Sequence, residues 1–224
     1  MDDVNIGIVG LGNVGSGTVT ILAENAAQIA LKLGFRLSVK IVSSLDADTR
    51  VLPEGLGQVE RSLDWRRVTS HPDVDIVVEL IGGTTVAREI LEAAIDNGKS
   101  VITANKELMA LAGPDIWDRA IKAGVNVAME ASVAGGIPIH AVLREGISGD
   151  RVEAFYGILN GTSNFILTEI EKRGDSLDTV LAEAQRLGYA EANPSADIDG
   201  FDARSKLVIL AAQIVVMAAF ACFV

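Results

Sequence analysis

Asp202 and Lys206 are the residues whose types and spacing point most directly to chemistry. They are four positions apart at the start of a helical pattern, so both side chains lie on one face of the expected helix. A lysine held by a carboxylate can deliver a proton to an oxygen on which negative charge develops, as happens when hydride is transferred to a carbonyl. The same spacing is typical of an ordinary helix ion pair, which contributes about 0.2–0.5 kcal/mol. From spacing alone, the ordinary ion pair is the simpler interpretation.

A glycine-rich loop near the start of the chain has the composition of a phosphate-binding turn. Residues 10–15 read GLGNVG, directly after the apolar run 6–9 and before a helical pattern. Gly10 permits a tight turn, Gly12 lets the backbone approach a pyrophosphate, and Gly15 allows the helix to pack closely on the strand. The N–H groups at the start of that helix attract phosphate oxygens. The sequence therefore predicts a dinucleotide site at this loop.

The end of the second expected strand, at residues 37–43, bears on which dinucleotide binds. NAD-specific sites normally place an Asp or Glu there, which accepts a hydrogen bond from the ribose 2′-hydroxyl. Residues 42–45 read VSSL, and the first acid, Asp46, comes later. Because no carboxylate would repel a 2′-phosphate, NADP is slightly favoured, with Ser43, Ser44 or Arg50 as candidate contacts. Use of NAD stays open.

These residues must be positioned by an α/β framework. Short Val/Ile-rich strands are expected at residues 6–9, 37–43, 75–80, 100–103 and 125–129, alternating with helices at 14–33, 86–97 and 115–123, and with an irregular stretch at 51–71. Nearly continuous apolar strands are typical of a parallel sheet covered on both faces, so we expect a Rossmann-type, doubly wound sheet. Lys106 follows the strand at 100–103, at the sheet edge where ligands bind, as either an exposed charge or a substrate contact.

The pattern changes at about residue 131, which predicts a dinucleotide-binding domain at 1–130 and a partial substrate-binding domain at 131–224. The second domain is expected to be of α+β type and incomplete. Its expected elements are a helix ending near 146, a strand at 151–159, helices at 164–172 and 176–187, and a last helix from about 201.

Composition excludes several functional classes. The chain has 224 residues, 19 Lys and Arg against 30 Asp and Glu, and a net charge of −11. Nucleic acids and anionic membrane surfaces are therefore disfavoured as main partners. One cysteine and two histidines leave little for a zinc enzyme or a serine-type triad. The first residues lack the basic and apolar pattern of a signal peptide, so a cytoplasmic protein is expected.

The final stretch, residues 207–224, carries no charge and is interrupted only by Gln213. A run of this length reaches the minimum for a membrane span. The preferred interpretation is a buried helix whose remaining domain is missing or altered.

Several motifs together resemble homoserine dehydrogenases. They are residues 6–17, ANK at 104–106, EASVAGGIP at 130–138, GILNGTSN at 157–164 and the stretch 188–207, which contains DIDGFDARSK. The resemblance runs from about residue 4 to residue 210 in the expected order, and the last two motifs are the most specific. It implies reversible NAD(P)-dependent reduction of L-aspartate 4-semialdehyde to L-homoserine, a step in the biosynthesis of threonine, methionine and isoleucine.

The resemblance also implies residue roles. Lys206 would donate and accept the proton at the substrate oxygen, and Asp202 would bind and orient the reacting groups. Glu191 would bind the substrate ammonium, and Lys106 would contact both the substrate and the cofactor.

Further implied sites are held largely by backbone atoms. Asn13 and Val14 would contact the cofactor pyrophosphate together with the glycines of the loop. A monovalent cation, usually Na⁺, would be held by Glu130, Val133, Gly135 and Ile137. Full-length members of the family are expected to form homodimers.

The segment after Lys206 departs from the family pattern. In the family this helix continues into more of the substrate domain, whereas here eighteen residues follow Lys206, all apolar except Gln213. A truncated or frame-altered product is therefore expected, and a dinucleotide-binding fragment without turnover is the main alternative to an active enzyme. A different nicotinamide oxidoreductase acting on an amino acid or sugar would leave the motifs around Asn160 and Asp202 unexplained.

Overall fold

The structure, a computed structural model, describes residues 3–147 and 149–221, with side chains described as far as residue 215. The chain divides into two compact units, Met1–Gly136 and Ile137–Val224.

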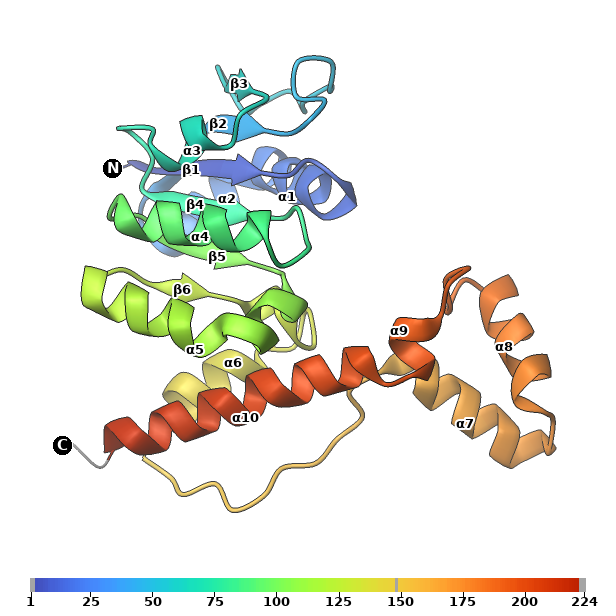
Figure 1. The fold of residues 1–224 in the computed structure, drawn as a ribbon. Helices are drawn as coiled ribbons and strands as arrows, with labels where there is room; N and C mark the ends of the chain where they lie inside the picture. Colours follow the sequence, from blue (N-terminus) through green and yellow to red (C-terminus); the bar gives the residue numbers. More distant parts are fainter. Residues whose placement is uncertain (1–2, 148, 222–224) are drawn as a thin grey trace. The chain divides into compact units, whose positions relative to one another are not determined.

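The first unit is built on a parallel sheet (Figure 1). In the described residues its strands are β1 Asp3–Val9, β2 Arg36–Ser43, β3 Glu60–Ser62, β4 Ile76–Glu79, β5 Ser100–Thr103 and β6 Val127–Ala128. They lie in the order β3-β2-β1-β4-β5-β6, and every pair is parallel. The chain runs outward from β1 to β3 and then returns to β4, so the strand order reverses between β1 and β4. The predicted doubly wound sheet is confirmed.

Helices cover both faces of this sheet. Figure 1 shows α4 and α5 in front of it and α1 and α2 behind. The helices are α1 Asn13–Glu24, α2 Ala26–Leu33, α3 Arg66–Thr69, α4 Val86–Asp96 and α5 Lys106–Ala123, and a 3₁₀ turn, η1, follows at Glu130–Ser132. Ile8, Leu11 and Val19 belong to a buried cluster that joins β1, the glycine loop and α1, so apolar burial fixes the loop on the sheet.

Several element boundaries differ from the expected ones, and at α5 a side-chain cap explains the difference. The helix predicted at 14–33 is divided at Asn25 into α1 and α2. The helix α5 begins at Lys106 instead of residue 115, because the Asn105 side chain caps it by accepting a hydrogen bond from the Leu108 N–H at 3.1 Å. Pro114 lies inside this helix, although a proline is more typical of a helix start. The stretch predicted to be irregular contains β3 and α3.

The second unit is helical in its described residues. Its helices are α6 Ile139–Ala141, a π-helical turn at Val142–Gly146, α7 Gly161–Arg173, α8 Leu177–Arg186, α9 Ser195–Ile198 and α10 Phe201–Ala221. The strand predicted at 151–159 is not formed. A strand needs a neighbour to satisfy its backbone, and the described part of this unit offers none. The α7 and α8 helices pack around the buried Ile166, Val180 and Ala184.

Gln213, the one polar interruption of the apolar run, connects α10 to α6. Its Oε1 lies 2.7 Å from Nδ1 of His140, and its Nε2 donates to the His140 carbonyl at 3.2 Å. Both residues are buried, so the helix is held by a satisfied polar pair as well as by apolar packing. No helix in the described residues is long and apolar enough to cross a membrane, and residues 222–224 of the predicted run lie outside those residues.

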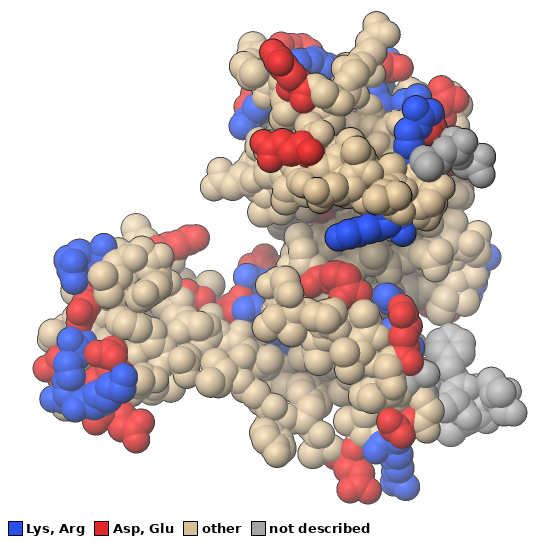
Figure 2. Space-filling view, turned by 180° about the vertical axis from the view of Figure 1, so that it is seen from behind, with Lys and Arg blue, Asp and Glu red and all other residues tan. Residues whose placement is uncertain are grey.

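Acidic and basic side chains are interspersed over the face drawn in Figure 2. The ion pairs show the same mixing at close range, since the Arg173 guanidinium contacts the carboxylates of Glu169, Asp175 and Glu183. The broad single-sign basic surface that nucleic acids favour is not seen on this face.

Candidate active site

The glycine loop follows β1 at the point where the strand order reverses. Gly10 has a φ of 101°, and a Cβ there would lie 2.7 Å from the Leu80 carbonyl group. A Cβ on Gly15 would lie 1.9 Å from the Gly10 carbonyl oxygen. The loop is also tied to β2, because the Gly10 N–H donates to the Ser43 carbonyl at 2.8 Å. Gly10 and Gly15 are therefore required by the turn itself.

Gly12 is different, because it faces open space. No atom lies within 4 Å of the position that its Cβ would occupy. It is the N-cap residue of α1, and no described side chain caps this helix. The first turn therefore presents backbone N–H groups, including those of Asn13 and Val14, beside an open position. This arrangement fits the pyrophosphate of a dinucleotide.

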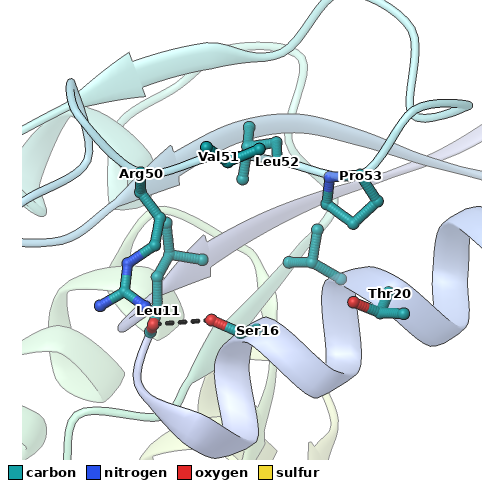
Figure 3. A pocket seen from close by; sticks show the side chains of 8 residues that line it. Leu11, Ser16, Thr20, Arg50, Val51, Leu52 and Pro53 are labelled. Atoms are coloured by element: carbon teal, nitrogen blue, oxygen red, sulfur yellow. Dashed lines mark hydrogen bonds between the residues drawn. The ribbon is translucent and has the colours of Figure 1, made fainter.

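A cavity of about 230 Å³ lies beside the loop (Figure 3). Its walls are Leu11, Ser16, Val19 and Thr20 on one side and the segment Arg50, Val51, Leu52 and Pro53 on the other. Figure 3 shows the Arg50 side chain extending toward Leu11, whose carbonyl accepts a hydrogen bond from Ser16 Oγ at 2.9 Å. The cavity thus places a guanidinium close to the predicted dinucleotide loop.

Asp46, the acid that comes late in the sequence, is drawn back toward the end of β2. Its carboxylate accepts from Ser44 Oγ at 2.6 Å and pairs with Arg50 at 2.7 Å. The Ser44 hydrogen bond and the Arg50 guanidinium lower the pKa of Asp46 below its usual value. The Asp46 carboxylate and the Arg50 guanidinium therefore lie together where the adenosine ribose of a dinucleotide binds in this type of fold.

In the second unit, Lys206 and Asp202 form an enclosed pair. The Lys206 ammonium lies 2.7 Å from the Asp202 carboxylate and donates to the Leu159 carbonyl at 2.8 Å. Their side chains are 20% and 5% exposed, respectively. An ordinary surface pair such as Lys122–Asp118 on α5 has side chains that are 74% and 63% exposed. The Lys206 ammonium is therefore held in a fixed position inside the protein.

Asn160 organises the same cluster, and sequence reasoning gave it no role. Its amide nitrogen donates to Asp197 at 2.7 Å and to Asp202 at 2.8 Å. Its amide oxygen accepts from the Ser163 N–H at 2.7 Å, which caps α7. The sequence signal was an asparagine directly before a helix. Its contacts with two distant carboxylates could not be anticipated from that signal.

These groups line a cavity of about 620 Å³. Its walls are Asn160, Gly161, Thr162, Phe165, Gly188, Tyr189, Asp197, Asp202 and Lys206. Phe165 and Tyr189 form an aromatic wall, with ring centroids 4.9 Å apart. Two carboxylates and one ammonium in a partly apolar cavity suit a small polar molecule with a cationic group and an oxygen that can accept a proton.

Lys106 and Glu191 are the other residues predicted to bind the substrate. Lys106 is the first residue of α5, at the carboxyl end of β5. Glu191 is exposed on the loop before α9, outside the residues that line the 620 Å³ cavity.

The predicted cation ligands span the unit boundary. Glu130, Val133 and Gly135 belong to the end of the first unit, and Ile137 begins the second. Glu130 lies in the 3₁₀ turn, and the turn that follows contains Ala134 with a φ of 52°. Within the described residues, no group of three or more His, Cys, Asp or Glu side chains is placed to hold a metal ion.

Replacing Asn160 with leucine is expected to destabilise the protein by about 1–3 kcal/mol, because two carboxylate contacts and a helix cap are lost together. Denaturant-induced unfolding measures the change. Asn164→Leu is the matched control, since Asn164 is exposed on the same helix. Equal unfolding midpoints for the two variants would show that Asn160 does not hold the cluster.

The sheet and the glycine loop define this molecule as a Rossmann-type dinucleotide-binding protein with a second, helical unit. The family model for the NAD-binding domain of homoserine dehydrogenase matches residues 10–130, and the model for homoserine dehydrogenase matches residues 138–220. The chain belongs to the homoserine dehydrogenase family, as the motifs predicted.

Relatives and solved structures agree with this assignment. The chain is 46% identical to the homoserine dehydrogenase of Pseudomonas aeruginosa over 211 residues, which are 94% of this chain and 48% of the relative. The crystal structure of a homoserine dehydrogenase from Thiobacillus denitrificans matches with a TM-score of 0.84 and 48% identity, over 94% of this chain and 48% of that one. A hyperthermophilic archaeal homoserine dehydrogenase in complex with NADPH matches with a TM-score of 0.79 and 28% identity, over 94% and 69% of the two chains. The chain spans about half the length of the curated relatives it matches.

Proposed function

We propose that this chain reduces L-aspartate 4-semialdehyde to L-homoserine with NAD(P)H, and catalyses the reverse reaction. The single observation that carries the proposal is the enclosed Lys206 ammonium. It is fixed by Asp202 and the Leu159 carbonyl at the wall of a polar cavity, in a chain of this family.

The bound cofactor would supply the hydride that adds to the aldehyde carbon. As the carbonyl bond becomes a single bond, negative charge develops on the substrate oxygen, and Lys206 Nζ donates a proton to it. Asp202 and the Leu159 carbonyl hold the ammonium in place for this transfer. In the reverse direction, the neutral amine accepts the hydroxyl proton of homoserine.

Substrate recognition is assigned to charged residues. The substrate carries an ammonium and a carboxylate, so it requires acidic and basic contacts. We assign Glu191 and Asp202 to the substrate, and Lys106 to both substrate and cofactor. The family resemblance supports these roles.

For the cofactor we propose NADPH as the preferred reductant, with NADH also accepted. The Arg50 guanidinium beside the end of β2 supports contact with a 2′-phosphate, and the Asp46 carboxylate that Arg50 and Ser44 both contact supports binding of the free ribose of NADH. The loop glycines together with Asn13 and Val14 would bind the pyrophosphate.

Family resemblance supports the remaining parts of the proposal. A Na⁺ ion would be held by Glu130, Val133, Gly135 and Ile137, because carboxylate and carbonyl oxygens are the hard ligands that such an ion prefers. We also propose a homodimer, a cytoplasmic location and a role in threonine, methionine and isoleucine biosynthesis.

The test is to add aspartate semialdehyde to the protein with NADPH and to follow the near-ultraviolet absorbance of NADPH. Consumption that requires both the protein and the aldehyde is expected. The alternative function is a dinucleotide-binding protein without turnover, for which the open position at Gly12 in the glycine loop would suffice. Tight NADPH binding without any consumption would establish that alternative and contradict the proposal.

A further inference from the structure

Glu79 is a fully buried carboxylate to which neither the proposed reaction nor the sequence assigns a role. It ends β4, and its side chain is 0% exposed. Its Oε2 accepts a hydrogen bond from Thr103 Oγ1 at 2.6 Å, and its Oε1 accepts from the N–H groups of Ile81 at 2.8 Å and Gly82 at 3.2 Å. A buried carboxylate is costly unless it is hydrogen-bonded, so this network holds Glu79 and its partners together.

The network continues to the start of α5. Thr103 Oγ1 accepts from the Asn105 N–H at 3.0 Å, so its own hydrogen is directed at Glu79. The Asn105 amide donates to the Gly83 carbonyl at 2.6 Å, and its oxygen caps α5 at Leu108. Glu79 thereby ties the loop after β4 to the turn that presents Lys106.

The network lies at the carboxyl ends of the strands, where a dinucleotide cofactor would bind. Glu79 pairs in register with Val9, the residue before the glycine loop. Ligands of this fold bind across the carboxyl ends of the strands where the strand order reverses. The loop after β2 serves the adenosine half of a dinucleotide, so the loops after β4 and β5 lie on the side of the nicotinamide half. Gly82 and Gly83 both have φ values above 70°, so this loop has an unusual backbone that must be held in place.

We propose that Glu79 is a positioning residue for the nicotinamide half of the cofactor. Its carboxylate fixes residues 81–83 and, through Thr103 and Asn105, the start of α5, so that both are preorganised before the cofactor binds. The inference rests on the proposed function only in taking the ligand to be a nicotinamide dinucleotide.

Substitutions that change single hydrogen bonds of the network test this proposal. Glu79→Gln keeps the shape, but one of the two acceptor oxygens becomes an NH₂ donor. If this donor faces Thr103, the Thr103 hydroxyl hydrogen loses its acceptor, and if it faces Ile81 and Gly82, it meets their N–H groups, so the network is broken in either orientation. Thr103→Val removes the hydroxyl, and Thr103→Ser restores it. Thr69→Val is the matched control, because Thr69 is equally buried and donates within α3.

The affinities for two ligands distinguish a positioning role of Glu79 from a general effect on protein stability. NADPH contains both halves of the cofactor, whereas adenosine 2′,5′-bisphosphate contains only the adenosine half. Fluorescence and calorimetric titrations of the whole chain give the two Kd values. We expect Glu79→Gln and Thr103→Val to raise the Kd for NADPH about tenfold, the loss expected for one well-placed hydrogen bond to a bound ligand. The Kd for the bisphosphate is expected to stay unchanged, and Thr103→Ser and Thr69→Val to leave both affinities at their original values.

Equal weakening of both ligands, or no change in either, would overturn the proposal. If Glu79→Gln does not fold, the comparison of Thr103→Val with Thr103→Ser decides between the same outcomes. These titrations need no turnover, so a failed positioning role is distinguishable from a failed dehydrogenase function. The latter would appear as absent NADPH consumption by the unaltered chain.

Discussion

Replacing Lys206 with arginine is expected to lower the rate of aldehyde reduction by about 10²–10⁴-fold, the usual contribution of a positioned general acid. Arginine keeps a positive charge beside Asp202, so the buried carboxylate retains a partner. Its guanidinium is not deprotonated in proteins, so it cannot hand a proton to the substrate oxygen. The measurement is the initial rate of NADPH consumption at saturating aldehyde, together with the Kd for NADPH. That Kd is expected to be unchanged, because this step concerns the proton alone.

Lys206→Met is a less direct variant, because it leaves Asp202 buried without its cation. Removing one partner of a buried pair costs about 3–5 kcal/mol, so loss of rate would be mixed with loss of stability. Lys122→Met is the matched control, since Lys122 also pairs with an acid four residues away but on the exposed surface. An undiminished rate in Lys206→Arg would show that another group donates the proton.

The second large effect is a loss of NADPH affinity, which is expected when Gly12 is replaced with alanine. Gly12→Ala should leave the protein folded, because its Cβ would meet no atom within 4 Å and its φ of −66° suits any residue. The added methyl group would instead occupy the space that a pyrophosphate needs. Losing one hydrogen bond to a charged group costs about 1.5–3 kcal/mol. NADPH affinity should therefore fall roughly 10- to 100-fold, as measured by fluorescence titration.

Two neighbouring glycines serve as controls for Gly12. Gly17→Ala also meets open space but lies within α1, so it should leave NADPH affinity unchanged and raise stability by about 0.5–1 kcal/mol. Gly15→Ala should unfold or severely destabilise the first unit, because its Cβ would lie 1.9 Å from a carbonyl oxygen. If Gly12→Ala bound NADPH as tightly as the unaltered chain, the cofactor would not approach this loop.

Features that depend on local pattern could be predicted from the sequence. The Val/Ile runs and the intervening helical periods gave the parallel sheet, because buried parallel strands are apolar on both faces. The strand–glycine–helix order placed the dinucleotide loop, and the four-residue spacing placed Asp202 beside Lys206. The enclosure of that pair could not be predicted, because burial depends on packing between distant segments.

Features that depend on long-range contacts were missed or misjudged. Asn160 reaches Asp197 and Asp202 across 37 and 42 residues of sequence. Glu79 is bonded to Thr103 across 24 residues, and in the sequence it resembles any acid at the end of a strand. The strand predicted at 151–159 is an element that the sequence predicted and the structure lacks. Its residue types suit a strand, but a strand forms only beside another strand, and sequence pattern does not show whether one is present.

The most direct test of the dehydrogenase account is isotope transfer from the cofactor to the product. The chain is incubated with aspartate semialdehyde and NADPH that carries deuterium at both hydride positions of the nicotinamide, and the amino acids are analysed by mass spectrometry. The account predicts homoserine that carries one deuterium on the former aldehyde carbon. Homoserine without deuterium, or no homoserine from a chain that binds NADPH, would contradict it.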